Sequence, residues 1–76
     1  SKNHIINTFS KKFGVTPYRY FLSCKLDMAK EYLLNTNMRI TEIAALLSYG
    51  DSQYFSACFK KATGYAPRAY REKFRV

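Results

Sequence analysis

The 76-residue chain has few of the side chains on which metal binding, disulfide bonding or catalysis depends. It has one histidine, His4, and two cysteines, Cys24 and Cys58, which lie far apart and form no C-x-x-C pair. These residues offer no plausible zinc constellation, and two reduced cysteines suit a cytoplasmic protein. Cys58 lies among apolar positions, so we expect it to be a small buried side chain.

Acidic residues are also scarce, since 5 Asp and Glu stand against 13 Lys and Arg, a net charge of +8. So large an excess in a short chain indicates a polyanionic partner, with nucleic acid as the first candidate and an anionic membrane surface as the second. The sequence has no paired-carboxylate cleft, no suitably spaced cysteine–histidine pair and no phosphate-cradling glycine loop. It therefore argues against an enzyme, and it indicates no cofactor and no metal.

Long apolar runs and a signal peptide are absent from the sequence, which argues against membrane spanning and export. A helix lying on a membrane surface would be basic on one side and broadly apolar on the other. The segment 17–35 fits this description in part, but burial between two structural units explains its apolar stripe better. With 47% apolar residues, the chain is expected to fold, either as one small domain or as two very small units that share a core.

A short pattern occurs twice in the chain, as FSKKFGVTPYRY over 9–20 and as FKKATGYAPRAY over 59–70. Five identities recur at a constant offset of 50 residues: Phe9/Phe59, Lys11/Lys61, Gly14/Gly64, Pro17/Pro67 and Tyr20/Tyr70. The chain is therefore expected to contain two copies of one structural unit. A repeat that only builds a symmetric core is the alternative, and the net charge argues against it.

The apolar spacing is typical of helices, and no strand-like alternation occurs, so we predict an all-α domain. A long helix is expected over 17–35, with Thr16 as N-cap and Pro17 at the first helical position. Its apolar stripe consists of Leu22, Leu26, Ala29 and Leu33.

Two shorter helices separated by a polar turn predict a helix-turn-helix. The first covers about 40–47, with Thr41 as its expected cap. The second covers about 52–63, is capped by Asp51 and ends at Gly64. Its inward stripe is expected to be Phe55, Cys58, Phe59 and Ala62.

A terminal helix should start at Pro67 and run toward Lys73, with a weaker cap because Ala66 stands where the first copy has Thr16. Applied to the second unit, the offset maps its second helix onto residues 2–13 and its first helix to positions before residue 1. We therefore expect the remainder of a first helix-turn-helix over 1–16, a linker helix over 17–35 and a second helix-turn-helix over 38–76. The chain would then be a fragment whose first unit lacks its opening helix.

Two copies of one unit are suited to binding duplex DNA, whose structure recurs at every helical turn of about 34 Å. A linker helix of 19 residues is roughly 28 Å long. Such a rod can hold two reading helices near one turn apart, so that both enter successive major grooves on one face of the duplex.

The offset also predicts the faces of the two reading helices. If Phe55 and Phe59 point inward, Ile5 and Phe9 should do so too. The outward face of the second unit is Ser52, Gln53, Ser56, Ala57, Lys60 and Lys61, and its counterparts are Lys2, Asn3, Ile6, Asn7, Ser10 and Lys11.

Gln53 and Asn3 are equivalent amides, and an amide can pair with an adenine edge in the major groove. Ile6 would contact a thymine methyl group or pack against the neighbouring unit. Phosphate contacts, which position a protein without selecting sequence, are expected from basic side chains and one helix N-terminus. These residues are Lys2, Lys11, Thr41, Lys60, Lys61, Arg68 and Arg71.

The run ITEIAALLSYGDSQYFSACFKKATGYAPRAYR resembles the second helix-turn-helix of the arabinose-regulator (AraC/XylS) family of bacterial transcription factors. The similarity includes I-x-x-I-A, Y-F-S-x-x-F-K-K-x-x-G and P-x-x-Y-R, and KLDMAKEYLL resembles the family's connecting helix. The resemblance implies two helix-turn-helix units on a long helix that bind promoter DNA, often as an activator. It also implies RNA polymerase as a partner and a separate sensing or dimerising domain in the parent chain.

The family's recognition positions fall on Asn3, Ile6 and Asn7 in the first unit and on Ser52, Gln53, Tyr54 and Ser56 in the second. Two departures stand out, because Ser48 replaces the family's turn glycine and Ala57 replaces a longer, often basic side chain. Gly50 is expected to absorb part of the bend at Ser48. The alternative function is a helical protein–protein interaction module without intrinsic DNA specificity.

Overall fold

A computed structural model describes residues 2–76, which form five helices and no strand, as the sequence predicts. The helices are α1 (Lys2–Phe13), α2 (Pro17–Asn35), α3 (Ile40–Leu46), α4 (Ser52–Thr63) and α5 (Pro67–Phe74). The predicted bounds of α1, α2 and α4 are confirmed, and α3 ends one residue earlier than predicted. Ser1, which the expected first unit includes, lies outside the described residues.

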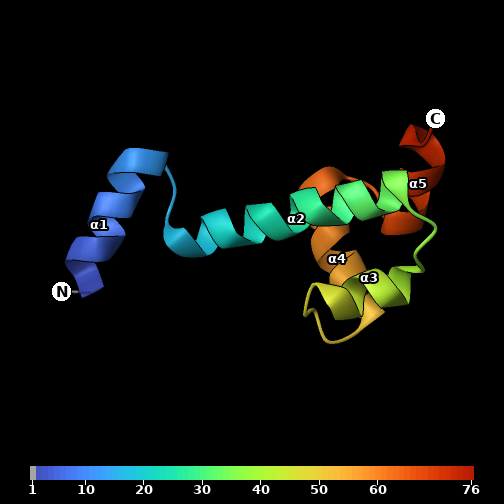
Figure 1. Cartoon of the computed structure of the whole chain (residues 1–76), viewed down its shortest axis with the longest axis horizontal. Helices are drawn as coiled ribbons and strands as arrows, with labels where there is room; N and C mark the ends of the chain where they lie inside the picture. The colour runs from blue at the N-terminus through green and yellow to red at the C-terminus, as the bar shows by residue number, and fades with distance from the viewer. Residues whose placement is uncertain (1) are drawn as a thin grey trace.

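The linker helix α2 organises the molecule, whose longest dimension is 43 Å (Figure 1). Helices α3, α4 and α5 gather around its C-terminal half, whereas α1 lies beyond its N-terminal end. The two parts of the repeat are therefore held apart along one rod.

The hydrophobic core belongs to the second unit. Phe55 and Phe59 are completely buried, and five smaller side chains complete the cluster: Ala29, Leu33, Ile43, Ala44 and Leu47. Burying one phenylalanine contributes about 1.5–3 kcal/mol, so these two rings are the main anchors of α4.

Two apolar stripes are covered less completely than predicted. On α2, Ala29 and Leu33 are buried but Leu22 and Leu26 are only half-buried, because the second unit covers only the C-terminal half of the helix. On α4, Cys58 is half-buried and Ala62 is exposed. The expectation that Cys58 is buried was therefore wrong.

The capping predictions hold for two helices. Thr16 Oγ1 accepts the Arg19 N–H at 3.3 Å, and Asp51 Oδ1 accepts the Tyr54 N–H at 2.7 Å. Ala66 makes no such bond at the start of α5, as expected.

The prediction that Thr41 caps α3 is wrong. The N-cap is Arg39, whose backbone N–H donates to Glu42 Oε1 at 2.8 Å. Since Ile40 already has helical geometry, Thr41 is the second residue inside the helix. The carboxylate of Glu42 suits the positive end of the helix dipole and satisfies the N–H of the N-cap residue, as the third helical residue does in a capping box.

The turn between α3 and α4 uses two left-handed residues, Ser48 with φ +63° and Gly50 with φ +87°. The Tyr49 N–H donates to the Ala44 carbonyl at 2.9 Å, and the Ser48 N–H donates to the Ala45 carbonyl at 3.1 Å. These two bonds form a Schellman motif, in which the left-handed position is usually glycine. The expected bend at Ser48 and Gly50 is thus confirmed.

The first unit departs from the symmetry that the repeat predicts. Ile5, the counterpart of Phe55, is 66% exposed, so the expectation that it points inward was wrong. In the second unit α3 covers the equivalent face of α4, and residues 2–16 contain no such helix. Phe9 is half-buried, with its ring centroid 4.4 Å from that of Phe13 and 5.6 Å from that of Tyr20.

Candidate nucleic-acid interface

The two repeated helices, α1 and α4, present amides to solvent at equivalent positions. Asn3 and Gln53, which are related by the offset of 50 residues, are both exposed, and Asn7 is exposed too. In the view of Figure 1 both helices run upward from their N-terminal ends, α1 beside one end of α2 and α4 across its other half. A similar direction of the two helices in this view is one requirement for binding a single extended partner.

The remaining predicted base-contacting positions are less accessible. Ile6, Ser52 and Ser56 are half-buried. On α4, Ser52 and Ser56 lie at the border between the core side, marked by Phe55, and the side that carries Gln53. Short hydroxyl side chains at such a border reach a partner only when the whole helix is closely docked against it.

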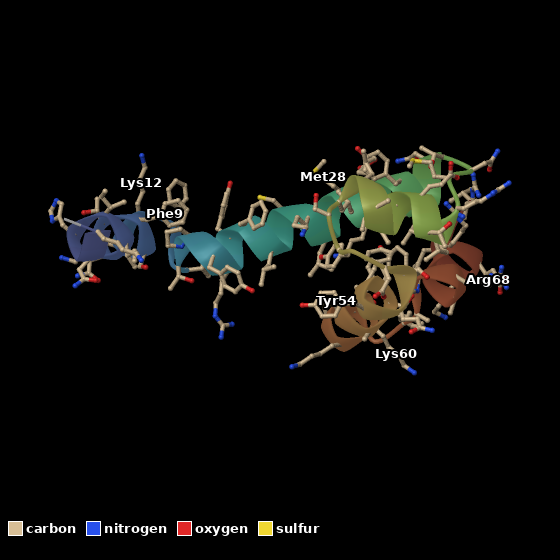
Figure 2. All side chains as sticks on the ribbon, turned by 90° about the horizontal axis from the view of Figure 1, so that it is seen from below. Phe9, Lys12, Met28, Tyr54, Lys60 and Arg68 are labelled. Atoms are coloured by element: carbon tan, nitrogen blue, oxygen red, sulfur yellow. The ribbon has the colours of Figure 1, made fainter. Side chains whose placement is uncertain are left out.

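Tyr54 lies on a different side of α4 from Gln53. The two are consecutive, so they are separated by about 100° around the helix axis. In Figure 2 Tyr54 points toward the N-terminal part of the molecule and Lys60 points away from it. We therefore leave Tyr54 out of the base-contacting residues that we propose below.

Tyr54 instead lines an open groove of about 630 Å³ between α2 and α4, together with Tyr18, Phe21, Tyr49 and Cys58. The Lys25 ammonium lies 4.1 Å from the centre of the Tyr49 ring, a cation–π contact. Burial, and then the neighbouring Cys58 and Tyr54, raise the pKa of Tyr49. A hydrogen bond with Cys58 raises the pKa of Tyr54, so both phenols are neutral at physiological pH.

Most of the cations predicted to contact phosphate are free of acidic partners. Across residues 2–76 a single ion pair is found, between Lys30 and Asp27 at 3.9 Å. The exposed cations among the candidates are Lys2, Lys11, Lys60, Lys61 and Arg68, and the uncharged candidate Thr41 is exposed as well. No Asp or Glu precedes Asp27 in the sequence, so the positive charge around α1 is not offset locally.

A cleft of about 430 Å³ separates the start of α3 from α5, and its lining includes Thr41, Arg68 and Glu72. It also includes Arg39, which the sequence analysis missed. Arg39 lies directly before the apolar repeat of α3, and this place at a predicted helix start could have identified it as a phosphate candidate from the sequence. Arg39 and Arg68 give this cleft two guanidinium groups near a helix N-terminus, a combination that suits phosphate.

Arg71 does not fit the phosphate role predicted for it, because its donors are engaged inside the fold. Its Nε donates to the Leu33 carbonyl at 2.9 Å, and its Nη2 donates to the carbonyls of Thr36 at 3.3 Å and Tyr32 at 3.4 Å. Desolvation by burial, and then the nearby Arg75, lower the pKa of Arg71. We therefore assign Arg71 to the structure of the domain and not to the phosphate contacts.

A turn that joins α3 to a more exposed helix, with basic side chains at the ends of both, defines a helix-turn-helix DNA-binding domain. Residues 1–73 match the family described as "Helix-turn-helix domain". The chain belongs to the AraC/XylS type of this family and is the DNA-binding domain of a bacterial transcriptional regulator.

Two regulators illustrate the sequence similarity. The chain is 33% identical over 75 residues to the MmsAB operon regulatory protein of Pseudomonas aeruginosa, covering 99% of this chain and 24% of that protein. It is 36% identical over 76 residues to the bifunctional transcriptional activator/DNA repair enzyme AdaA of Bacillus subtilis, covering 100% of this chain and 36% of that protein. The chain thus spans about a quarter of one relative and about a third of the other.

Solved structures support the same assignment. The C-terminal domain of AraT, a response regulator from Geobacillus stearothermophilus, superposes with a TM-score of 0.91 at 30% identity, over 100% of this chain and 63% of that one. The C-terminal domain of the response regulator yesN from Fusobacterium nucleatum superposes with a TM-score of 0.84 at 34% identity, over 93% and 69%. None of the helices within residues 2–76 combines the length and apolar character needed to cross a membrane.

Proposed function

We propose that α1 and α4 enter successive major grooves on one face of promoter DNA. In this arrangement Asn3 and Gln53 read base edges, with Asn7, Ser52, Ser56 and Ile6 at the borders of the two contacts. Phosphates on either side are held by Lys2, Lys11, Thr41, Lys60, Lys61 and Arg68. The observation that carries the proposal is the pair of exposed amides at equivalent positions of two repeated helices.

The parent protein is proposed to be a cytoplasmic regulator in which this domain accompanies a sensing or dimerising domain and acts on RNA polymerase at the promoter. Support comes from the relatives, which are regulators several times longer than the matched region. Expression from a reporter promoter that carries the bound site would test this part, because it should change when the parent gene is deleted.

The DNA contacts are tested with a duplex selected by the wild-type chain from a random-sequence library. Replacing Gln53 with alanine should weaken binding to the selected duplex by about 1–3 kcal/mol and relax the base preference at one position. Replacing Lys61 with alanine should weaken the selected and random duplexes alike and lower the slope of log K against log salt by about one.

The two variants are controls for each other, because one removes an amide and the other a cation from the same helix. Equal losses for Gln53→Ala on selected and random DNA would rule out its role in reading bases. If the wild-type chain enriches no duplex over random DNA at moderate salt, the whole proposal fails.

A further inference from the structure

The C-terminal end of the linker helix α2 is capped locally by Thr36 alone. The last four carbonyls of a helix have no partner within it and are usually satisfied by a left-handed residue or by basic side chains of the last turn. Here the last turn of α2 has no basic residue, and the next residue, Thr36, is extended with φ −136°. Only the Tyr32 carbonyl is bonded locally, by the Thr36 N–H at 3.2 Å and by the Thr36 hydroxyl.

Arg71 of α5 and Arg75, the residue directly after α5, donate to carbonyls at this end of α2. Arg71 bridges the carbonyls of Leu33, Tyr32 and Thr36, as described above. Arg75 Nη2 donates to the Thr36 carbonyl at 2.9 Å and to Asn37 Oδ1 at 2.7 Å. We name these two residues the α5 arginine clamp.

The clamp is also favourable electrostatically, because it puts two positive charges at the negative end of the α2 dipole. Two guanidinium groups placed side by side repel one another unless each has acceptors. The carbonyls of Tyr32, Leu33 and Thr36 provide them, so the arrangement depends on the position of the end of α2 relative to α5.

The position of α1 depends on the direction of α2. Helix α1 contacts α2 through the rings of Phe9, Phe13 and Tyr20, and it lies beyond the N-terminal end of α2 in Figure 1. The linker is roughly 28 Å long, so a tilt of about 10° at its clamped end moves the other end by roughly 5 Å. That displacement exceeds the rise of about 3.4 Å for one base pair.

The core holds α2 through Ala29 and Leu33, with Leu26 and Tyr32 packed against it. The clamp adds bonds to the Tyr32 and Leu33 carbonyls at the end of this stretch and extends the attachment beyond it, to the Thr36 carbonyl and Asn37 Oδ1. An attachment over a longer stretch of a rod restricts its tilt more than a shorter one does.

We propose that Arg71 and Arg75 are positioning residues for DNA recognition, which fix the spacing between α1 and α4 without touching DNA. The inference rests on the proposed function, in which α1 and α4 occupy successive major grooves. It assigns spacing specificity to α5, a helix outside both reading surfaces.

The test uses the bipartite duplex selected by the wild-type chain. A series of probes changes the spacing between its two halves by one or two base pairs, and one further probe keeps only the half bound by α4. The wild-type chain should show a sharp optimum at the selected spacing. Arg71→Lys keeps the positive charge but removes the planar guanidinium that bonds several carbonyls at once. In this variant the ratio of the affinity for the bipartite site to the affinity for the half-site should fall at least about tenfold. Its affinity for the half-site should stay within about twofold of that of the wild type.

Arg68→Lys is the matched control, because Arg68 is an exposed arginine of the same helix. It should alter affinity by a similar factor at every spacing. Arg75→Gln gives a second measurement that leaves the bonds of Arg71 in place, and it should broaden the optimum by a smaller amount.

An unchanged optimum in both Arg71→Lys and Arg75→Gln would overturn the inference. So would a uniform loss at all spacings and on the half-site, which would indicate a charge or folding effect. If the wild-type chain prefers no bipartite duplex over random DNA, the proposed function itself has failed, and this is known before any variant is measured.

Discussion

Replacing Ser48 with glycine should stabilise the domain. Ser48 occupies the left-handed position of the Schellman motif that ends α3, with φ +63°. A left-handed backbone costs an L-residue roughly 1–2 kcal/mol. Glycine avoids this cost but loses about 0.5–1 kcal/mol more conformational freedom on folding. The difference predicts a gain of about 0.5–1 kcal/mol in the free energy of unfolding.

For a domain of this size such a gain corresponds to a rise in Tm of about 2–8 °C. Thermal and urea unfolding followed by far-ultraviolet circular dichroism would measure it. The matched control is Ser48→Ala, which removes the same hydroxyl but keeps the Cβ atom. Alanine should give no gain, because the strain comes from the Cβ atom in a left-handed backbone. A Ser48→Gly variant no more stable than wild type, or an equal gain for both variants, would refute the reasoning.

Other substitutions probe the rest of the second unit by the same unfolding measurements. Asp51→Ala removes the side chain that accepts the Tyr54 N–H and should cost about 1 kcal/mol, whereas Asp51→Asn should restore most of it. Gly64→Ala should cost about 0.5–1 kcal/mol, the strain at φ +86° less the conformational entropy that alanine saves, since a Cβ atom there would meet nothing within 4 Å. Phe59→Ala should cost about 3–5 kcal/mol and unfold the second unit, because this ring is completely buried; a loss below about 1 kcal/mol would contradict the described core. Because the folded-state pKa of Tyr49 is raised above its unfolded value, its contribution is present below about pH 10 and is lost as the pH rises above that; Tyr49→Phe should reduce this alkaline loss in urea titrations.

The sequence predicted the helices well because their limits depend on local chemistry. Thr16 and Asp51 mark the starts of α2 and α4, and Gly64 marks the end of α4 with a left-handed residue. The start of α3 was harder to predict, because two residues near it have oxygen-bearing side chains. Thr41 matched the usual cap, and the carboxylate of Glu42 in fact bonds the Arg39 N–H. The three-dimensional structure is needed to show which of these two side chains bonds at the start of the helix.

The candidate site was predictable as two equivalent faces but not residue by residue. The offset of 50 residues identifies Asn3 and Gln53 as equivalent positions, and both side chains are exposed. It cannot identify Arg71 as a clamp, since the carbonyls it bonds are those of Tyr32, Leu33 and Thr36, more than 30 residues away. Basic residues near helix ends look alike in a sequence, whether they bind phosphate or another part of the same chain.

Stability and positive charge are distributed differently over the two halves of the domain. The buried core lies entirely within the second unit and the half of α2 that it covers, whereas no residue of α1 is buried. Conversely, every acidic residue of the chain lies at or after Asp27, so α1 and the start of α2 carry positive charge without any negative charge. A helix of 12 residues with no buried side chain gains little stability from packing within the described residues. The second unit is therefore suited to presenting a fixed reading surface, and α1 adds positive charge that no acidic residue nearby offsets.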